Sequence, residues 1–405
     1  MIVPQLGGRV MQVQFGGHDY LFVNPAYEGK YISPAEAAKA DKWVNYGGDK
    51  LWPLPEGRGD AEHWPGPISD QLDDGEYSFY VVSENARCTV RLDGPSDPRT
   101  GLQYTREITI SASSPEISFH AVMKNASDHP IRWSVQSVTQ YKTEDSQDRT
   151  RYNHDFWAFA PANPRSAFVD GHYVRNGLAD DPSFSVADGL FTLHWLYLEN
   201  EVWLDSNAGW VAVIDNASNF GMVERFHYAQ NAEYPGHASV IFYKNGAAIE
   251  LDSDGMPQLR STDHRSTPYY MEAELNSPMV RLQPGETYSF DTSWCPVRAG
   301  KDLKVVSPVG VIEVPLNATL ETSGLRLQGT FGVFFAGRLS AYIYDAAGKQ
   351  HVAALGMVDP LRPVQLDQTI PAADAVRVAL HLSDEQGADL GVLGEARIVR
   401  PRQES

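Results

Sequence analysis

The sequence predicts an all-β protein. Alternation with period two recurs along most of the chain, as in RVMQVQF, YSFYVVS and IRWSVQSVTQY, and this period is typical of strands with one buried face. The runs are rich in β-branched and aromatic residues and are bounded by Gly, Pro, Asn, Asp or Ser, which favour turns. Only the segment after Ser33 begins like a helix, with Ser33 as N-cap, Pro34 at the first position and Glu36 at the third.

Two domains are expected. The predicted strands before residue 300 are too many for one open sheet, so we expect two large antiparallel sheets packed face to face. All tryptophans also lie before residue 300. The later residues form short strands separated by turn segments such as DAAGK and DEQGAD, which is typical of a small immunoglobulin-like β-sandwich. We place the two domains at residues 1–298 and 299–405.

The charge of the chain excludes some partners. The chain has 405 residues and a formal net charge of -19, which would repel nucleic acid and anionic membranes. No segment is apolar enough to span a membrane, and the first residues do not resemble a signal peptide. We expect a soluble protein that is periplasmic or secreted if a leader was removed and cytoplasmic otherwise; the compartment and the oligomeric state stay open. Cys88 and Cys295 are either two thiols or one disulfide.

An aromatic loop is the first candidate site. The stretch WVNYGGDKLWPLPEG, residues 43–57, combines tryptophans with paired glycines and polar side chains, and Trp64 follows shortly after it. Aromatic faces stack on the C–H faces of sugars, and polar groups bind sugar hydroxyls. Core packing is the alternative for each tryptophan. The candidate sugar contacts are Asn45, Asp49, Lys50, Trp52 and Trp64.

Two further segments hold polar groups. On a strand over residues 131–142, Gln136 and Gln140 would share one face, where buried amides need either a ligand or a structural network. The segment 221–246 contains carboxylates and imidazoles that can transfer protons near neutral pH; its candidates are Glu224, His227, Glu233 and His237. No HExxH motif and no paired Cys or His cluster occurs, so we expect neither a metal nor another cofactor.

Four segments carry a resemblance to a known family. They are VPQLGGRVMQVQF, NYGGDKLWP, MKNASDHPIRWSVQSVTQ and EAELNSPMVRLQPGETYSFDTSW. Together they resemble, over roughly residues 1–298, an uncharacterised bacterial family of the galactose-mutarotase-like (aldose 1-epimerase-like) superfamily. The resemblance implies a β-supersandwich with a sugar-binding face. This fold is shared by epimerases, polysaccharide lyases and accessory domains of glycosidases, so it does not select a reaction.

The resemblance also implies catalytic positions. The mutarotase GGRI motif matches residues 7–10, and their Asn followed by His-Gly-Gly matches residues 45–48, with Tyr46 in place of the histidine. Their general-base glutamate resembles Glu233, which precedes Pro235-Gly236. The histidine acid of mutarotases has no counterpart, since the matching strand offers Gln136 and Gln140, and an amide cannot replace it. The catalytic candidates are Tyr46, Glu233, His237 and Glu224.

These residues lead to several expected functions. The first is a protein that binds and processes a sugar or oligosaccharide by acid/base chemistry, as an epimerase-like isomerase or as an eliminative lyase. For elimination, the set would be Tyr46, Lys50, Gln136, Gln140 and His237. The alternatives are a non-catalytic carbohydrate-binding protein and a glycoside hydrolase, which would need two carboxylates facing one pocket.

Overall fold

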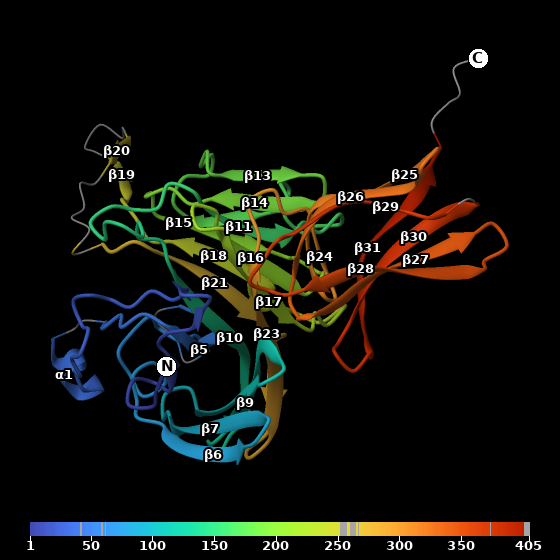
Figure 1. Ribbon diagram of the computed structural model, residues 1–405. Coiled ribbons are helices and arrows are strands. Elements are labelled where there is room, and N and C mark those ends of the chain that lie inside the picture. Colours follow the sequence, from blue (N-terminus) through green and yellow to red (C-terminus); the bar gives the residue numbers. More distant parts are fainter. Residues whose placement is uncertain are drawn as a thin grey trace. The chain divides into compact units, whose positions relative to one another are not determined.

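The computed structural model of the protein is nearly all β, as the alternation predicts (Figure 1). The structure describes residues 1–40, 43–57, 60, 62–251, 257–259, 265, 267–372 and 374–400. The chain divides into two compact units. The first consists of Met1–Ile110, Ile117–Val213 and Glu224–Trp294, and the second of Ser111–Glu116, Ile214–Val223 and Cys295–Ser405. The domain division at residue 298 stays a prediction.

A nine-stranded antiparallel sheet positions the candidate site. Its strands follow the order β1 (Ile2–Val3), β2 (Arg9–Val10), β5 (Asp49–Leu54), β10 (Ile131–Lys142), β21 (Tyr270–Asn276), β18 (Val240–Lys244), β15 (Asn200–Leu204) and β12 (Tyr173–Asn176), and β22 (Val280–Leu282) also pairs with β10. Strands that lie far apart in sequence are therefore neighbours in space.

A ten-stranded sheet forms the other large layer. Its order is β13 (Phe184–Ala187), β14 (Leu190–His194), β11 (Phe156–Pro161), β16 (Trp210–Asp215), β17 (Phe220–Phe226), β23 (Thr287–Arg298), β9 (Ser114–Asn125), β8 (Leu102–Ser111), β7 (Arg87–Ser96) and β6 (Ser78–Glu84). Two small hairpins complete the strands of this part of the chain: β3 (Gln14–Phe15) with β4 (His18–Asp19), and β19 (Ile249–Leu251) with β20 (Pro257–Leu259).

The two large sheets pack face to face, which confirms the prediction. Asp49 of β5 forms a buried ion pair with Arg106 of β8 across the interface. The Tyr141 hydroxyl of β10 donates to Glu224 of β17 at 2.6 Å. On β5 and β10 the side chains facing the other sheet alternate with those on the opposite face, as strand geometry requires.

The predicted helix is present but short. Helix α1 spans Pro34–Lys39, and the Ser33 and Glu36 side chains form a capping box at its N-terminus. A single 3₁₀ turn, η1 (Pro235–His237), precedes β18.

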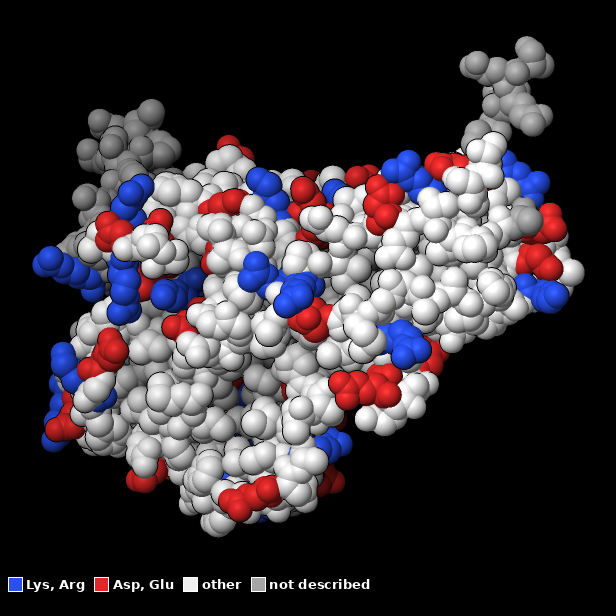
Figure 2. Space-filling view, in the orientation of Figure 1, with Lys and Arg blue, Asp and Glu red and all other residues white. Residues whose placement is uncertain are grey.

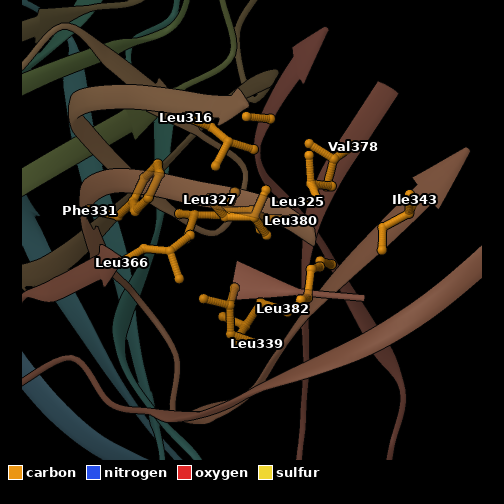
Figure 3. Packing of buried hydrophobic residues seen from close by; sticks show 14 of the residues in the cluster. Leu316, Leu325, Leu327, Phe331, Leu339, Ile343, Leu366, Val378, Leu380 and Leu382 are labelled. Carbon is orange, nitrogen blue, oxygen red and sulfur yellow. The ribbon is translucent and has the colours of Figure 1, made fainter. Parts of the chain in front are cut away.

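The second unit contains a small β-sandwich, as predicted. One layer holds β24 (Val305–Ser307), β25 (Gly310–Glu321), β26 (Gly324–Val333) and β29 (Val364–Ile370), and the other holds β27 (Gly337–Asp345), β28 (Gln350–Val358), β30 (Ala375–Ser383) and β31 (Asp389–Val399). Strands β25 and β31 pair in parallel. Leucines of both layers form the core, including Leu316, Leu327, Leu339 and Leu380 (Figure 3).

Two further expectations concern cysteines and membranes. Cys88 and Cys295 are not joined by a disulfide, so the disulfide alternative is wrong. Among the described residues, no helix has the length and apolar character that a membrane span needs. On the face that Figure 2 shows, acidic and basic side chains are interspersed.

Candidate functional site

One face of the nine-stranded sheet carries a row of polar and aromatic side chains. Directly paired residues of antiparallel strands point to the same face. On β5 and β10, Trp52 pairs with Gln136. On β10 and β21, Gln140 pairs with Glu272, while Glu274 lies two residues further along β21 on the same face. This face is turned away from the ten-stranded sheet, because Asp49 and Thr139, at the alternate positions, point into the sheet interface.

A cavity of about 260 Å³ lies on this face and is here called the carboxylate pocket. Its residues come from β5, β10, β12, β15, β18, β21 and neighbouring loops. The lining residues are Trp43, Trp52, Leu54, Glu56, Pro67, Gln136, Arg175, Glu199, Glu201, Ile241, Tyr243, Tyr270, Glu272 and Glu274.

Two tryptophans form one wall of the carboxylate pocket. The indole N–H groups of Trp43 and Trp52 both donate to the Asp73 carboxylate, each at 2.7 Å. The two rings meet edge to face with centroids 5.9 Å apart. Lys50 lies over the Trp52 ring, with its Nζ 4.3 Å from the centroid. This network fixes the orientation of both rings at the edge of the pocket.

Asp73 belongs to a buried ionic cluster behind that wall. Its Oδ1 accepts from Arg9 at 2.7 Å, and Asp74 accepts from the same guanidinium at 3.2 Å. All three side chains are buried. Burial raises the pKa of Asp74 to about 8, and the negative charge of Asp73 adds to this effect. Asp73 is therefore the principal counter-ion of Arg9 at neutral pH.

Glu272 and Glu274 line the pocket from β21. Glu272 accepts a hydrogen bond from the Gln140 amide at 2.6 Å and lies 3.5 Å from Lys50 Nζ. Glu274 accepts from the Gln136 amide. Burial, followed by the negative charge of Glu272, raises the pKa of Glu274 well above its usual range. Burial therefore favours the protonated form of Glu274, the form that can donate a proton.

A second pair of glutamates lies around Arg175. Arg175 Nη1 is 3.2 Å from Glu201 Oε1 and 3.7 Å from Glu56 Oε2. Glu201 also accepts from the Trp203 indole at 2.6 Å. Burial raises the pKa of Glu56 to about 8, with a further contribution from the charge of Glu201 and opposition from Arg175. The pocket thus combines two carboxyl groups whose pKa is raised by burial, Glu56 and Glu274, with two that lie next to Lys50 or Arg175.

The strand register sets the spacing across the pocket. Glu272 of β21 pairs with Tyr243 of β18, which pairs with Glu201 of β15. Neighbouring strands are about 4.8 Å apart, so the backbones carrying Glu272 and Glu201 are separated by about 10 Å. Tyr243 and Ile241 form the floor between them. Glu272 and Glu201 therefore lie on one face of the sheet, two strands apart, on either side of Tyr243.

Several predicted site residues lie at or next to the carboxylate pocket. Trp52 and Gln136 line it. Lys50 and Gln140 contact Glu272, which lines the pocket. The Asn45 amide interacts with Tyr270, another lining residue. Both glutamines belong to a structural network, since each amide donates to a glutamate of the pocket; their contact with a ligand stays a prediction.

The remaining predicted binding residues lie elsewhere. Trp64 is fully buried behind Trp52, with ring centroids 5.1 Å apart, and donates to Asp70 at 3.0 Å. Asp49 points to the opposite face of β5, where it pairs with Arg106. His227 is exposed after the end of β17. Trp64 and Asp49 do not line the carboxylate pocket, because core packing and strand alternation direct them inward.

The four predicted catalytic residues do not converge. The Tyr46 hydroxyl is bound to the main-chain N–H and C=O of Ile32, at 2.9 and 3.0 Å. Glu224 is buried between the sheets, and burial raises its pKa to about 8. Glu233 is exposed and paired with Arg132, and His237 is exposed in η1. The expectation that these four form one catalytic group is corrected: they lie on different faces and loops.

Sequence reasoning missed the glutamates that line the pocket. They are Glu56, Glu199, Glu201, Glu272 and Glu274. The segment YYMEAELN contained a usable indication, because Glu272 and Glu274 occupy alternate positions of a strand and therefore one face. Among the described residues, no group of three or more His, Cys, Asp or Glu side chains is arranged to hold a metal ion.

Comparison with known proteins places the similarity in the fold. No protein-family model matches the chain, and no curated protein matches it. Solved structures do match. A galactose mutarotase-like protein from Lactobacillus casei is 9% identical, covers 72% of this chain and 95% of its own, and gives a TM-score of 0.43. A galactose mutarotase-like protein from Clostridium acetobutylicum is 11% identical, with 73% and 91% coverage and a TM-score of 0.42.

A third match is a galactose mutarotase related enzyme from Lactobacillus acidophilus. It is 12% identical, covers 75% of this chain and 96% of its own, and gives a TM-score of 0.42. At these identities the similarity concerns the fold and says nothing about the reaction.

Proposed function

We propose that the protein processes a sugar by proton transfer in the carboxylate pocket, with Glu274 as the acid and Glu201 as the base. The observation that supports this most strongly is that one cavity holds both the buried Glu274, whose pKa is raised, and Glu201, which is paired with Arg175. Groups whose environments separate their protonation states are suited to acid and base roles.

The reaction that this pair serves best is ring opening of a reducing sugar. Glu201 accepts the proton of the anomeric hydroxyl while Glu274 donates a proton to the ring oxygen. The bond between the anomeric carbon and the ring oxygen breaks, and the open-chain aldehyde forms. Closure on the other face of the carbonyl, with both proton transfers reversed, gives the other anomer.

In this proposal Glu274 takes the place of the histidine acid of mutarotases, which has no counterpart in the sequence. The strand that carries the histidine acid in mutarotases carries Gln136 here, and Gln136 donates to Glu274. Elimination from a uronate fits the pocket less well, because a substrate carboxylate at the reacting carbon would lie among five glutamates.

The test uses anomer exchange followed by NMR for a panel of reducing mono- and oligosaccharides. We expect Glu274→Gln to lower the exchange rate by about 100-fold or more, the usual size of an acid/base contribution, while sugar affinity stays within a few-fold. Glu233→Gln is the matched control, since Glu233 is exposed and, within the described part of the chain, forms its ion pair with Arg132, away from the carboxylate pocket.

Two outcomes would contradict the proposal. A Glu274→Gln variant with full exchange activity would exclude Glu274 as the acid. A wild-type protein that binds sugars but accelerates no exchange would favour the non-catalytic binding function, for which the tryptophan wall alone suffices.

A further inference from the structure

A second cavity of about 700 Å³ lies near the other end of β10 and is here called the arginine pocket. It has a basic lining although the whole chain is strongly acidic. Its residues come from the start of β10, from β22 and from four connecting loops. They are Pro55, Glu62, His63, Arg99, Thr100, His129, Pro130, Ile131, Arg132, Trp133, Met279 and Arg281.

Two arginines of this pocket lie in positions where their charges repel each other and destabilise the fold. Arg132 of β10 and Arg281 of β22 are directly paired across the two strands, and like charges in that position repel each other. Arg132 is partly compensated by Glu233. Within the described part of the chain, Arg281 and Arg99 form no ion pair. An anion bound between them would relieve this repulsion.

Acidic side chains do not neutralise the arginine pocket. Glu62 is the one carboxylate among its lining residues. The two histidines already have carboxylate neighbours, since His63 lies 2.7 Å from Asp60 and His129 lies 3.1 Å from Asp128. The unpaired positive charge therefore belongs to the arginines, whose planar guanidinium groups bind oxyanions in two-point contacts.

One arginine of the arginine pocket, Arg132, lies on the same face of the sheet as the carboxylate pocket. By strand alternation, Arg132 points to the same side of β10 as Gln136, four residues away. At about 3.3 Å per residue, the two positions are about 13 Å apart. Residues 54–56 also connect the pockets, because Leu54 and Glu56 line the first and Pro55 lines the second.

We infer that the arginine pocket is an oxyanion subsite for an acidic substituent of an oligosaccharide. The substituent is a sulfate, phosphate or carboxylate carried on a sugar unit beyond the one held in the carboxylate pocket. Arg132, Arg281 and Arg99 bind it, while the glutamates at the other end select a neutral unit. This inference rests on the proposed function for its oligosaccharide, although the anion site itself does not.

The experiment compares a neutral tetrasaccharide with its monosulfated derivative by calorimetry, with an oligouronate and a phosphorylated oligosaccharide as further arms. We expect the sulfated ligand to bind about tenfold more tightly, as one charge-assisted contact allows. Arg281→Ala and Arg132→Ala should abolish this difference and leave the affinity for the neutral tetrasaccharide unchanged. Arg165→Ala, an exposed arginine of the same unit, is the control.

The outcomes separate this inference from the proposed function. If both variants bind the sulfated ligand as tightly as the wild type, the anion subsite is excluded. Titration with inorganic sulfate provides a second measurement. If no oligosaccharide binds but sulfate saturates the wild type and not Arg281→Ala, the proposed function fails and the anion site stands. Thermal unfolding checks that the exposed substitutions leave the fold intact.

Discussion

Asp73→Asn should weaken both the fold and the tryptophan wall. The Asp73 carboxylate accepts from the indoles of Trp43 and Trp52 and from Arg9, each at 2.7 Å. An asparagine keeps the shape but offers only one acceptor oxygen, so at least one of these buried donors loses its partner. The buried Arg9 also loses its principal counter-ion.

The magnitude follows from these contacts. Hydrogen bonds to charged groups contribute about 1.5–3 kcal/mol each, and breaking a buried ion pair costs about 3–5 kcal/mol. Asp74 reduces this cost. Its pKa of about 8 depends in part on the charge of Asp73, so in the variant that pKa falls and Asp74 becomes the counter-ion of Arg9. We therefore expect Asp73→Asn to lower the free energy of unfolding by about 2–4 kcal/mol.

Denaturant unfolding measures this change, and calorimetry measures sugar affinity in the folded variant. Affinity should fall because the two indole rings lose their common acceptor. Asp128→Asn is the control, since Asp128 is exposed and contacts the exposed His129. A variant whose unfolding free energy stays within about 0.5 kcal/mol of the wild type would refute the role assigned to Asp73.

Two further substitutions test buried groups outside the carboxylate pocket. The folded-state pKa of Glu224, about 8, lies above its ordinary value of 4.5, so the folded protein binds more protons between these pH values and loses stability as pH rises through that window. Glu224→Gln should remove up to about 1.4 kcal/mol per pH unit of that slope, and unfolding curves that fall equally steeply in both proteins would contradict this. Tyr46→Phe removes both hydrogen bonds to Ile32 and should cost about 1–2 kcal/mol of stability with sugar turnover unchanged. Loss of turnover in a folded variant would restore Tyr46 as a proton carrier.

Local sequence patterns alone determined the fold class, the face on which two glutamines lie and the start of the helix. Period-two alternation predicted the all-β class, and it correctly placed Gln136 and Gln140 on one face of β10. The capping box at Ser33 and Glu36 marked the start of α1. These features depend on residues close in sequence, because strand alternation and helix caps are local geometric rules.

Only the tertiary structure decided which side chains meet. Glu272 and Glu201 lie near each other on one face of the sheet because β21, β18 and β15 are neighbours in a particular register. That register depends on packing between strands separated by many residues, which no local pattern contains. For the same reason Tyr46, Glu224 and Glu233 seemed to form one group in the sequence, although the fold directs them to a loop contact, the sheet interface and the surface.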